Sequence, residues 1–167
     1  MFDGAHVQTG AGRYVQCHGA LKRLGQEVAY YGEKIAVLYG DETIKAKTGC
    51  RIEESLKASG LEYKDLVFEG PSTKESFQEV SEILKSWGAQ VVVGVGGGRI
   101  IDIAKGASDL ADIRVFTAPT SAATCAAYAV LYVEYGSDGR IASSNFLRHE
   151  ISGVLADLDY ILNDCPL

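Results

Sequence analysis

The chain has 167 residues, of which 47% are hydrophobic, and 16 Lys and Arg against 22 Asp and Glu give it a formal net charge of −6. This length and composition allow one domain with a core of its own. The acidic balance, with no long run of either charge, argues against a nucleic-acid partner. No stretch approaches the ~20 apolar residues of a membrane span, and no export signal is recognisable, so we expect a cytoplasmic protein without a membrane partner.

Hydrophobic spacing predicts a helix first and then an alternation of strands and helices. Leu21, Leu24 and Val28 recur at helical spacing, which predicts a helix from Tyr14 to Tyr31, broken near Gly25. Short apolar runs then predict strands at 35–39, 66–68, 90–95 and 114–117. Segments with helical spacing lie between these strands, at 42–59, from 72 to about 87, and after the glycines that follow residue 95.

This alternation predicts an α/β fold, a Rossmann-like parallel sheet with helices on both faces, because parallel strands need long right-handed crossovers. Ser72, followed three residues later by Glu75, predicts a capping box at the start of the second helix between strands. After Pro119 the pattern changes: the segments 130–135 and 141–146, joined by a turn at 136–139, predict a β-hairpin added to the sheet. A last strand is expected at 153–156.

Three consecutive glycines, Gly96, Gly97 and Gly98, follow the 90–95 strand and open the next helix. Glycines at such a turn let the backbone approach a diphosphate closely, and the helix N-terminus presents unpaired N–H donors to it. The alternative is a tight turn that only needs a positive φ. The spacing matches neither the Gly-x-Gly-x-x-Gly fingerprint nor a P-loop.

The sequence from Gly96 to Lys105, Gly-Gly-Gly-Arg-Ile-Ile-Asp-Ile-Ala-Lys, resembles the Gly-Gly-Gly-x-x-x-Asp-x-Ala-Lys signature of the iron-containing alcohol dehydrogenase superfamily, in its glycerol dehydrogenase-like branch. The loop at 10–19, the Asp41 position and the Pro119-Thr120 pair stand in the order that this family shows. The resemblance implies that residues 1–167 are an N-terminal dinucleotide-binding domain of an NAD(P)-dependent oxidoreductase. Such an enzyme transfers hydride between nicotinamide and a small alcohol, polyol or 2-hydroxy acid.

The resemblance also assigns cofactor-binding residues. The pyrophosphate would be lined by Gly96, Gly97, Gly98 and Arg99, and the cofactor would be contacted further along by Thr120, Leu131 and Tyr135. Asp41 would accept a hydrogen bond from the adenine ribose, and because a carboxylate repels a 2′-phosphate we expect NAD rather than NADP. A helix N-cap is the alternative role for Asp41. Asp102 is assigned a structural or ribose role, with a surface ion pair to Lys105 as the alternative.

The loop after Thr120 departs from glycerol dehydrogenases. Cys125 stands where glycerol-using members carry a substrate-binding aspartate, and a thiol cannot replace a carboxylate as acceptor. The run from Ala123 to Ala127 resembles a subgroup that acts on 2-hydroxy or 2-oxo acids, where removal of the aspartate lessens repulsion. We therefore assign Cys125 to the substrate site as a hypothesis, with a nucleophilic cysteine as the alternative.

The resemblance further implies a divalent metal, zinc or iron, held by a helical C-terminal domain that we expect to be absent from this chain. His6, His18 and His149 form no metal-binding pattern, so we assign neither a metal ligand nor a catalytic residue here, and we expect the isolated chain to be inactive. We expect a small-molecule substrate and a homo-oligomer. Two alternatives stay open: a non-catalytic nucleotide sensor or truncated inactive product, and a sugar-phosphate or dehydroquinate-type synthase.

Overall fold

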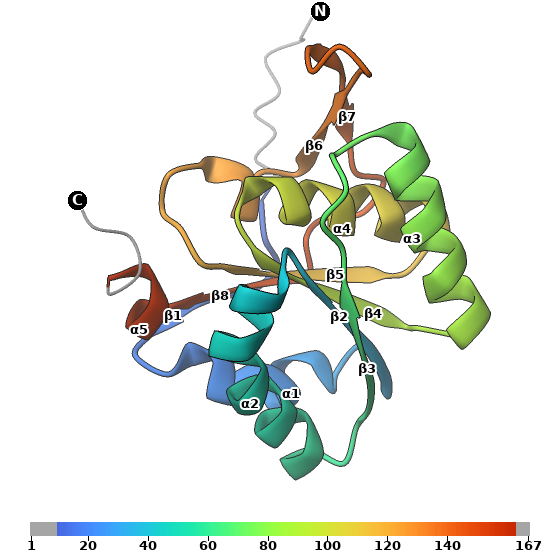
Figure 1. Ribbon diagram of the computed structural model, residues 1–167. Helices are drawn as coiled ribbons and strands as arrows, with labels where there is room; N and C mark the ends of the chain where they lie inside the picture. Colours follow the sequence, from blue (N-terminus) through green and yellow to red (C-terminus); the bar gives the residue numbers. More distant parts are fainter. Residues whose placement is uncertain (1–9, 163–167) are drawn as a thin grey trace, which may run out of the picture.

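The computed structural model describes residues 10–162, and at its centre lies a six-stranded parallel sheet (Figure 1). The strands in sheet order are β1 (Tyr14–Cys17), β8 (Gly153–Asp157), β5 (Arg114–Pro119), β4 (Val91–Gly96), β2 (Lys34–Tyr39) and β3 (Glu62–Val67). The central strand β4 is entirely buried, as expected for a β-branched run covered on both sides. The prediction of a Rossmann-like α/β fold is confirmed.

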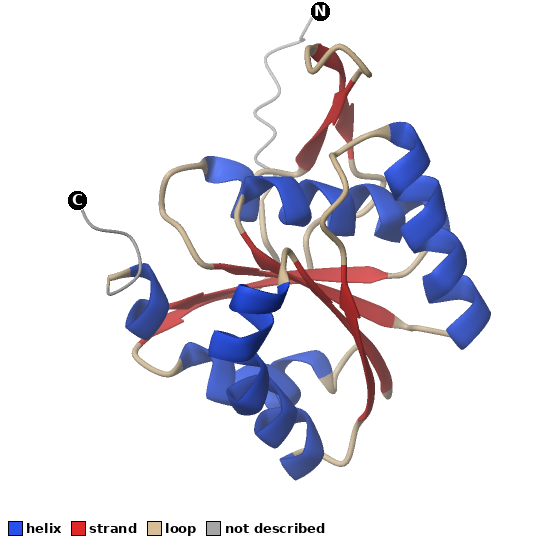
Figure 2. Cartoon of the chain, viewed as in Figure 1, coloured by secondary structure: helices blue, strands red, loops and turns tan. Residues whose placement is uncertain are grey.

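Helices cover both faces of the sheet (Figure 2). On one face lie the short helix η1 (Ala20–Arg23), α1 (Leu24–Val28), α2 (Glu42–Ala58) and α5 (Leu158–Ile161), and on the other lie α3 (Lys74–Trp87) and α4 (Gly98–Ala111). Side chains of β4 alternate between two cores, with Val91 and Val93 packed towards α1 and α2, and Val92 packed towards α3 and α4. The sheet is therefore buried on both sides.

The helix predicted from Tyr14 to Tyr31 is wrong in its first part. Residues Tyr14–Cys17 form β1, which pairs in parallel with β8, and only the turns from Ala20 onwards are helical. Gly19, at φ 72°, separates the two elements. The partner strand lies far away in sequence, so local spacing carried no sign of this pairing.

Three further expectations differ in detail. Strand β3 begins at Glu62, earlier than the predicted 66, because it pairs with β2 along its whole length. The capping box is wrong: Thr73 caps α3, and the Ser72 hydroxyl instead donates to the Val133 carbonyl at 2.8 Å. The last strand extends one residue further than predicted, to Asp157.

The predicted hairpin is present but does not extend the central sheet. Strands β6 (Leu131–Tyr135) and β7 (Ile141–Phe146) pair with each other in a separate antiparallel sheet. The hairpin packs on the α3 and α4 side, where the Tyr132 ring meets Phe77 edge-on at 5.3 Å between centroids. The hairpin therefore lies above α4 in the view of Figure 1 and adds no strand to the central sheet.

The strand register brings the carboxyl ends of β2, β4 and β5 to one edge. Tyr39 is opposite Val95, and Gly96 is opposite Pro119. The loops that follow these strands therefore meet at this edge, where ligands bind in open parallel α/β sheets. The loop after β5 contains the short helix η2 (Cys125–Ala127), which leads into the hairpin.

Candidate functional site

The glycine turn between β4 and α4 is built from glycines with different roles. Gly96 has φ +142°, and a Cβ added there would lie 2.7 Å from Ile100 Cγ2, so the turn itself requires this glycine. Gly97 has φ −80°, which any residue adopts, and a Cβ there would meet nothing within 4 Å. The turn explanation therefore accounts for Gly96, whereas Gly97 faces open space at the N-terminus of α4.

The N-terminus of α4 has the features of an anion-binding helix end. Gly97 is the N-cap residue and provides no side-chain cap for the first turn of the helix, which contains no acidic side chain. Backbone N–H groups at such an end favour a bound anion. The open space beside Gly97 leaves room for a bound group next to these N–H donors.

Arg99 fastens the loops around the turn. Its guanidinium donates to the Gly40 carbonyl at 2.6 Å and to the Phe68 carbonyl at 3.1 Å, and also to the Gly70 carbonyl. These bonds link the loops after β2 and β3 to the first turn of α4. The sequence motif gave no sign of this structural task, because the acceptors are backbone carbonyls; the predicted pyrophosphate contact of Arg99 stays a prediction.

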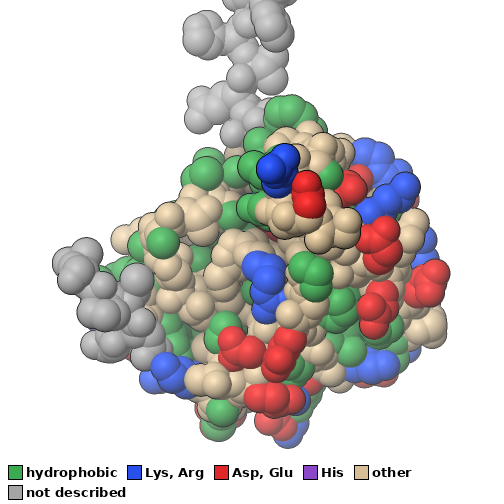
Figure 3. All heavy atoms as spheres, turned by 45° about the horizontal axis from the view of Figure 1, so that its top comes forward, with side chains coloured by type: hydrophobic (Ala, Val, Ile, Leu, Met, Phe, Trp, Pro, Cys, Tyr) green, Lys and Arg blue, Asp and Glu red, His purple; other side chains and the backbone are tan. Residues whose placement is uncertain are grey.

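A cleft of about 640 Å³, here called the first cleft, lies between the start of α4, the loop before α3 and the hairpin. Among its lining residues are six of those predicted for the site: Gly98, Arg99, Asp102, Cys125, Leu131 and Tyr135. The wall of the first cleft is mostly apolar. In Figure 3 much of the left half of the drawn face is uncharged, and charged side chains gather towards the right and the lower edge. The cleft thus offers few charges to a ligand.

A second pocket of about 300 Å³ lies at the same edge of the sheet and contains Asp41 and Thr120. Asp41 Oδ1 accepts from the Ile44 N–H at 2.8 Å, so the N-cap role is confirmed, and it leaves the ribose role undecided. The Thr120 N–H donates to the Gly96 carbonyl at 3.1 Å. Gly98 lines the first cleft, and Thr120, which bonds Gly96, lines the second pocket. The two hollows therefore both adjoin the glycine turn.

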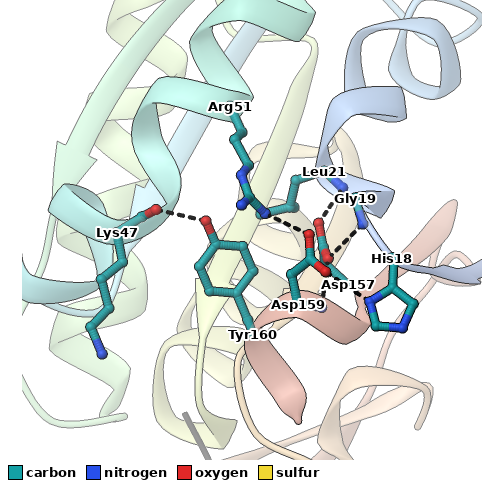
Figure 4. A network of polar contacts seen from close by, with 8 residues as sticks. All are labelled: His18, Gly19, Leu21, Lys47, Arg51, Asp157, Asp159 and Tyr160. Atoms are coloured by element: carbon teal, nitrogen blue, oxygen red, sulfur yellow. Dashed lines mark hydrogen bonds and ion pairs between the residues drawn. The ribbon is translucent and has the colours of Figure 1, made fainter. Parts of the chain in front are cut away.

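The wall of the second pocket is held by a polar network (Figure 4). Asp157 accepts from the N–H groups of Gly19 at 3.0 Å and Leu21 at 2.9 Å, and it also caps α5. Asp159 accepts from His18 Nδ1 at 2.7 Å and from Arg51 at 3.0 Å.

The same network reaches the pocket lining through α5. The Tyr160 hydroxyl donates to the Lys47 carbonyl at 2.6 Å, and both residues line the second pocket. The loop after β1 and helix α5 are thus fixed against α2. His18 serves as the partner of a carboxylate in this network.

Asp102 and Lys105 form a buried pair, so the surface ion pair is wrong. The Lys105 side chain is 0% exposed, and its Nζ lies 3.8 Å from Asp102 Oδ1. Burial raises the pKa of the Asp102 carboxyl to about 6, although the Lys105 charge opposes this shift. Burial lowers the pKa of the Lys105 ammonium to about 8, although Asp102 opposes that shift in turn.

Within residues 10–162, no three His, Cys, Asp or Glu side chains are grouped so that they could hold a metal ion. His149 lies beside Asp112 at 3.4 Å, and the predicted role of His6 lies outside the described residues. These side chains do not fit the divalent metal that the resemblance implies. In the same part of the chain, no helix is both long and apolar enough to cross a membrane.

The parallel sheet, the glycine turn and the hollows at its carboxyl edge define a Rossmann-like α/β domain. The family model for iron-containing alcohol dehydrogenases matches residues 11–152, and the chain belongs to this family. It is 30% identical over 150 residues to the glycerol dehydrogenase of Thermotoga maritima, a match that covers 90% of this chain and 40% of that protein.

Two further comparisons agree. The chain is 40% identical over 91 residues to the NAD(P)⁺-linked glycerol-1-phosphate dehydrogenase of Thermococcus sibiricus, covering 54% of this chain and 25% of that protein. The crystal structure of glycerol dehydrogenase from Schizosaccharomyces pombe superposes with a TM-score of 0.85 at 27% identity, covering 95% of this chain and 40% of that one. The chain is thus an oxidoreductase-family domain similar to glycerol dehydrogenase, and it spans about two fifths of the length of such relatives.

Proposed function

We propose that this chain binds NAD as the dinucleotide-binding part of an oxidoreductase that transfers hydride between nicotinamide and a small alcohol, polyol or 2-hydroxy acid. The observation that carries the proposal is the open space at Gly97, at the uncapped N-terminus of α4, between two hollows that hold eight of the predicted site residues. When bound, the nicotinamide ring exchanges hydride with the substrate carbon.

The two hollows suggest how the cofactor lies across the turn. The diphosphate would rest on the N–H groups after Gly97, with the adenine ribose at Asp41 in the second pocket and the nicotinamide half along Leu131 and Tyr135 in the first cleft. Thr120 would face the cofactor from the end of β5. The carboxylate of Asp41 favours a free 2′-hydroxyl over a 2′-phosphate, which supports NAD over NADP.

Cys125 supports an oxo-acid or hydroxy-acid substrate. It is exposed in the lining of the first cleft, where a neutral thiol does not repel an anionic substrate as an aspartate would. In an active enzyme that contains this chain, we expect 2-oxobutanoate to be preferred to glycerol in kcat/KM. A preference for glycerol would reject this substrate class. The metal that the family resemblance implies is not held by the described residues, so we assign no reaction step to it.

Isothermal titration of the 1–167 chain tests the proposal. We expect weak but saturable binding of NAD⁺, and we expect no turnover of any substrate by this chain, because the nicotinamide end of a dinucleotide normally lies in a cleft between two domains. Metal-dependent turnover by purified 1–167 would contradict the second expectation. A titration without heat of binding at millimolar NAD⁺ would contradict the first.

Gly97→Ser makes the test specific to the turn. Serine is a favoured N-cap residue, so the free energy of unfolding should change by less than about 0.5 kcal/mol. The new side chain occupies the open space and competes for the helix N–H groups, so NAD⁺ affinity should fall about tenfold or more. Gly96→Ala is the matched control: its positive φ and close contact to Ile100 predict a stability loss of about 2 kcal/mol.

A further inference from the structure

Lys105 is a buried cation whose three donors are all used inside the protein. Its side chain is 0% exposed, and it is not among the residues that line the first cleft. The ammonium donates to the Ala129 carbonyl at 2.7 Å, to the Leu131 carbonyl at 2.9 Å and to the Ala126 carbonyl. An ammonium has three hydrogens, so these bonds saturate it.

The three acceptors belong to one stretch, residues 124–131, which is loop apart from η2 and the first residue of β6 and is here called the wall segment. It contains η2 and the turn into β6, and four of its side chains, together with Leu131 at its end, reach the first cleft or its rim: Thr124, Cys125, Ala126 and Ala129. The buried hydroxyl of Thr117 donates to the Ala127 carbonyl at 2.8 Å. Four carbonyls of the wall segment therefore point inward to α4 or β5, those of Ala126, Ala127, Ala129 and Leu131, while several of its side chains line the cleft.

Burial of the Lys105 ammonium, or of these carbonyls without a donor, costs free energy, and their hydrogen bonds to each other offset both costs. Placing an ammonium in the core requires its removal from water, and the pKa of Lys105, lowered to about 8, reflects that penalty. Carbonyls buried without donors would be costly in turn. The Asp102 carboxylate compensates part of the Lys105 charge. Asp102 also lines the first cleft, so the buried pair reaches from the cleft to the wall segment.

We propose that Lys105 is a positioning residue: by holding the inward carbonyls of the wall segment it sets the shape of the first cleft, and thereby the binding of the nicotinamide half of the dinucleotide. The shape-setting role stands on the contacts alone. The effect on the dinucleotide rests on the proposed function. The two parts are therefore tested separately.

The first test needs no ligand. Amide hydrogen exchange, read by peptide mass spectrometry, reports opening of the wall segment, whose carbonyls at residues 126, 129 and 131 bond Lys105. Lys105→Met should raise the amide exchange of residues 126–131 by about tenfold or more, since bonds to a charged donor are lost. Lys85→Met, the same change at an exposed site on α3, should leave this exchange unchanged.

Two additions keep this test decisive if Lys105→Met does not fold. The double variant Asp102→Asn/Lys105→Met leaves no unpaired buried carboxylate and should show the same opening. In the wild-type chain, acetylation of Lys105 should be slower than that of Lys85 by about tenfold or more, since the ammonium is reached only when the wall segment opens. Equal acetylation of the two lysines, or folded Lys105 variants with unchanged amide exchange of residues 126–131, would overturn the positioning role.

The second test uses two ligands. We expect Lys105→Met to weaken NAD⁺ binding about tenfold and to leave binding of AMP, which lacks the nicotinamide riboside half, unchanged. Equal affinities of the variant and the wild type for NAD⁺ would overturn the effect on the dinucleotide. If the wild type binds neither ligand, the proposed function fails, while the amide exchange and the lysine acetylation still decide the role of Lys105.

Discussion

The two hollows beside the glycine turn have walls of different construction. The second pocket is bounded mainly by α2, whose backbone groups are paired within a regular helix, by α5, which Asp157 and its neighbours fasten, and by Thr120 and Ser121 after β5. The first cleft is bounded on one side by the wall segment, three of whose carbonyls accept hydrogen bonds from one buried side chain, Lys105. Each wall therefore has one buried side chain on which its loop region depends: Asp157 for the loop after β1 and α5, and Lys105 for the wall segment.

The largest effect that we expect is at Asp157, the buried side chain that fastens the wall of the second pocket. Asp157→Ala should lower the free energy of unfolding by about 3 kcal/mol, because the N–H groups of Gly19 and Leu21 and that of residue 159 lose a buried acceptor. Urea denaturation measures the loss. Asp159→Ala is the control in the same network: its ion pairs are partially exposed and screened by water, so the loss should be clearly smaller than that of Asp157→Ala. Equal losses would show that the network is not anchored by Asp157.

The same contrast separates the features that the sequence predicted from those that it did not. The parallel sheet followed from local hydrophobic periods, and the position of the glycine turn followed from the motif at Gly96. β1 was missed because its pairing, Tyr14 opposite Val154, spans almost the whole chain and leaves no local pattern. The role of Lys105 was missed because its acceptors are carbonyls, which every residue carries, so no residue type signals them.

A second prediction concerns the pH dependence of stability that arises from Asp102, which lines the first cleft. The pKa of Asp102 is about 6 in the folded chain, against 3.8 for an unperturbed carboxyl, so between these pH values the folded state binds more protons than the unfolded state. Stability from this group therefore falls as pH rises from about 4 to about 6.5. Asp102→Asn lacks that loss, so relative to the wild type it should gain about 2 to 3 kcal/mol across this window.

Chemical denaturation of both chains at several pH values measures this difference. The other titrating groups are common to the two chains and their contributions cancel, except that of Lys105, whose pKa falls further when the Asp102 charge is removed. Parallel stability curves from pH 4 to pH 6.5 would show that folding does not penalise the Asp102 charge. The neighbouring Lys105 would then hold the carboxylate more strongly than burial disfavours it.

The smallest effect on stability is expected at Asp41, where structure and proposed function use the same side chain. Serine also caps helices well, so Asp41→Ser should keep α2 intact, with a change in unfolding free energy below about 0.5 kcal/mol. The substitution removes the negative charge from the second pocket, so affinity for NADP⁺ should rise relative to NAD⁺ by about tenfold. Competitive titration of the two dinucleotides measures the ratio. An unchanged ratio with an intact helix would leave Asp41 the role of an N-cap alone, and discrimination against the 2′-phosphate would have to come from other residues of the second pocket.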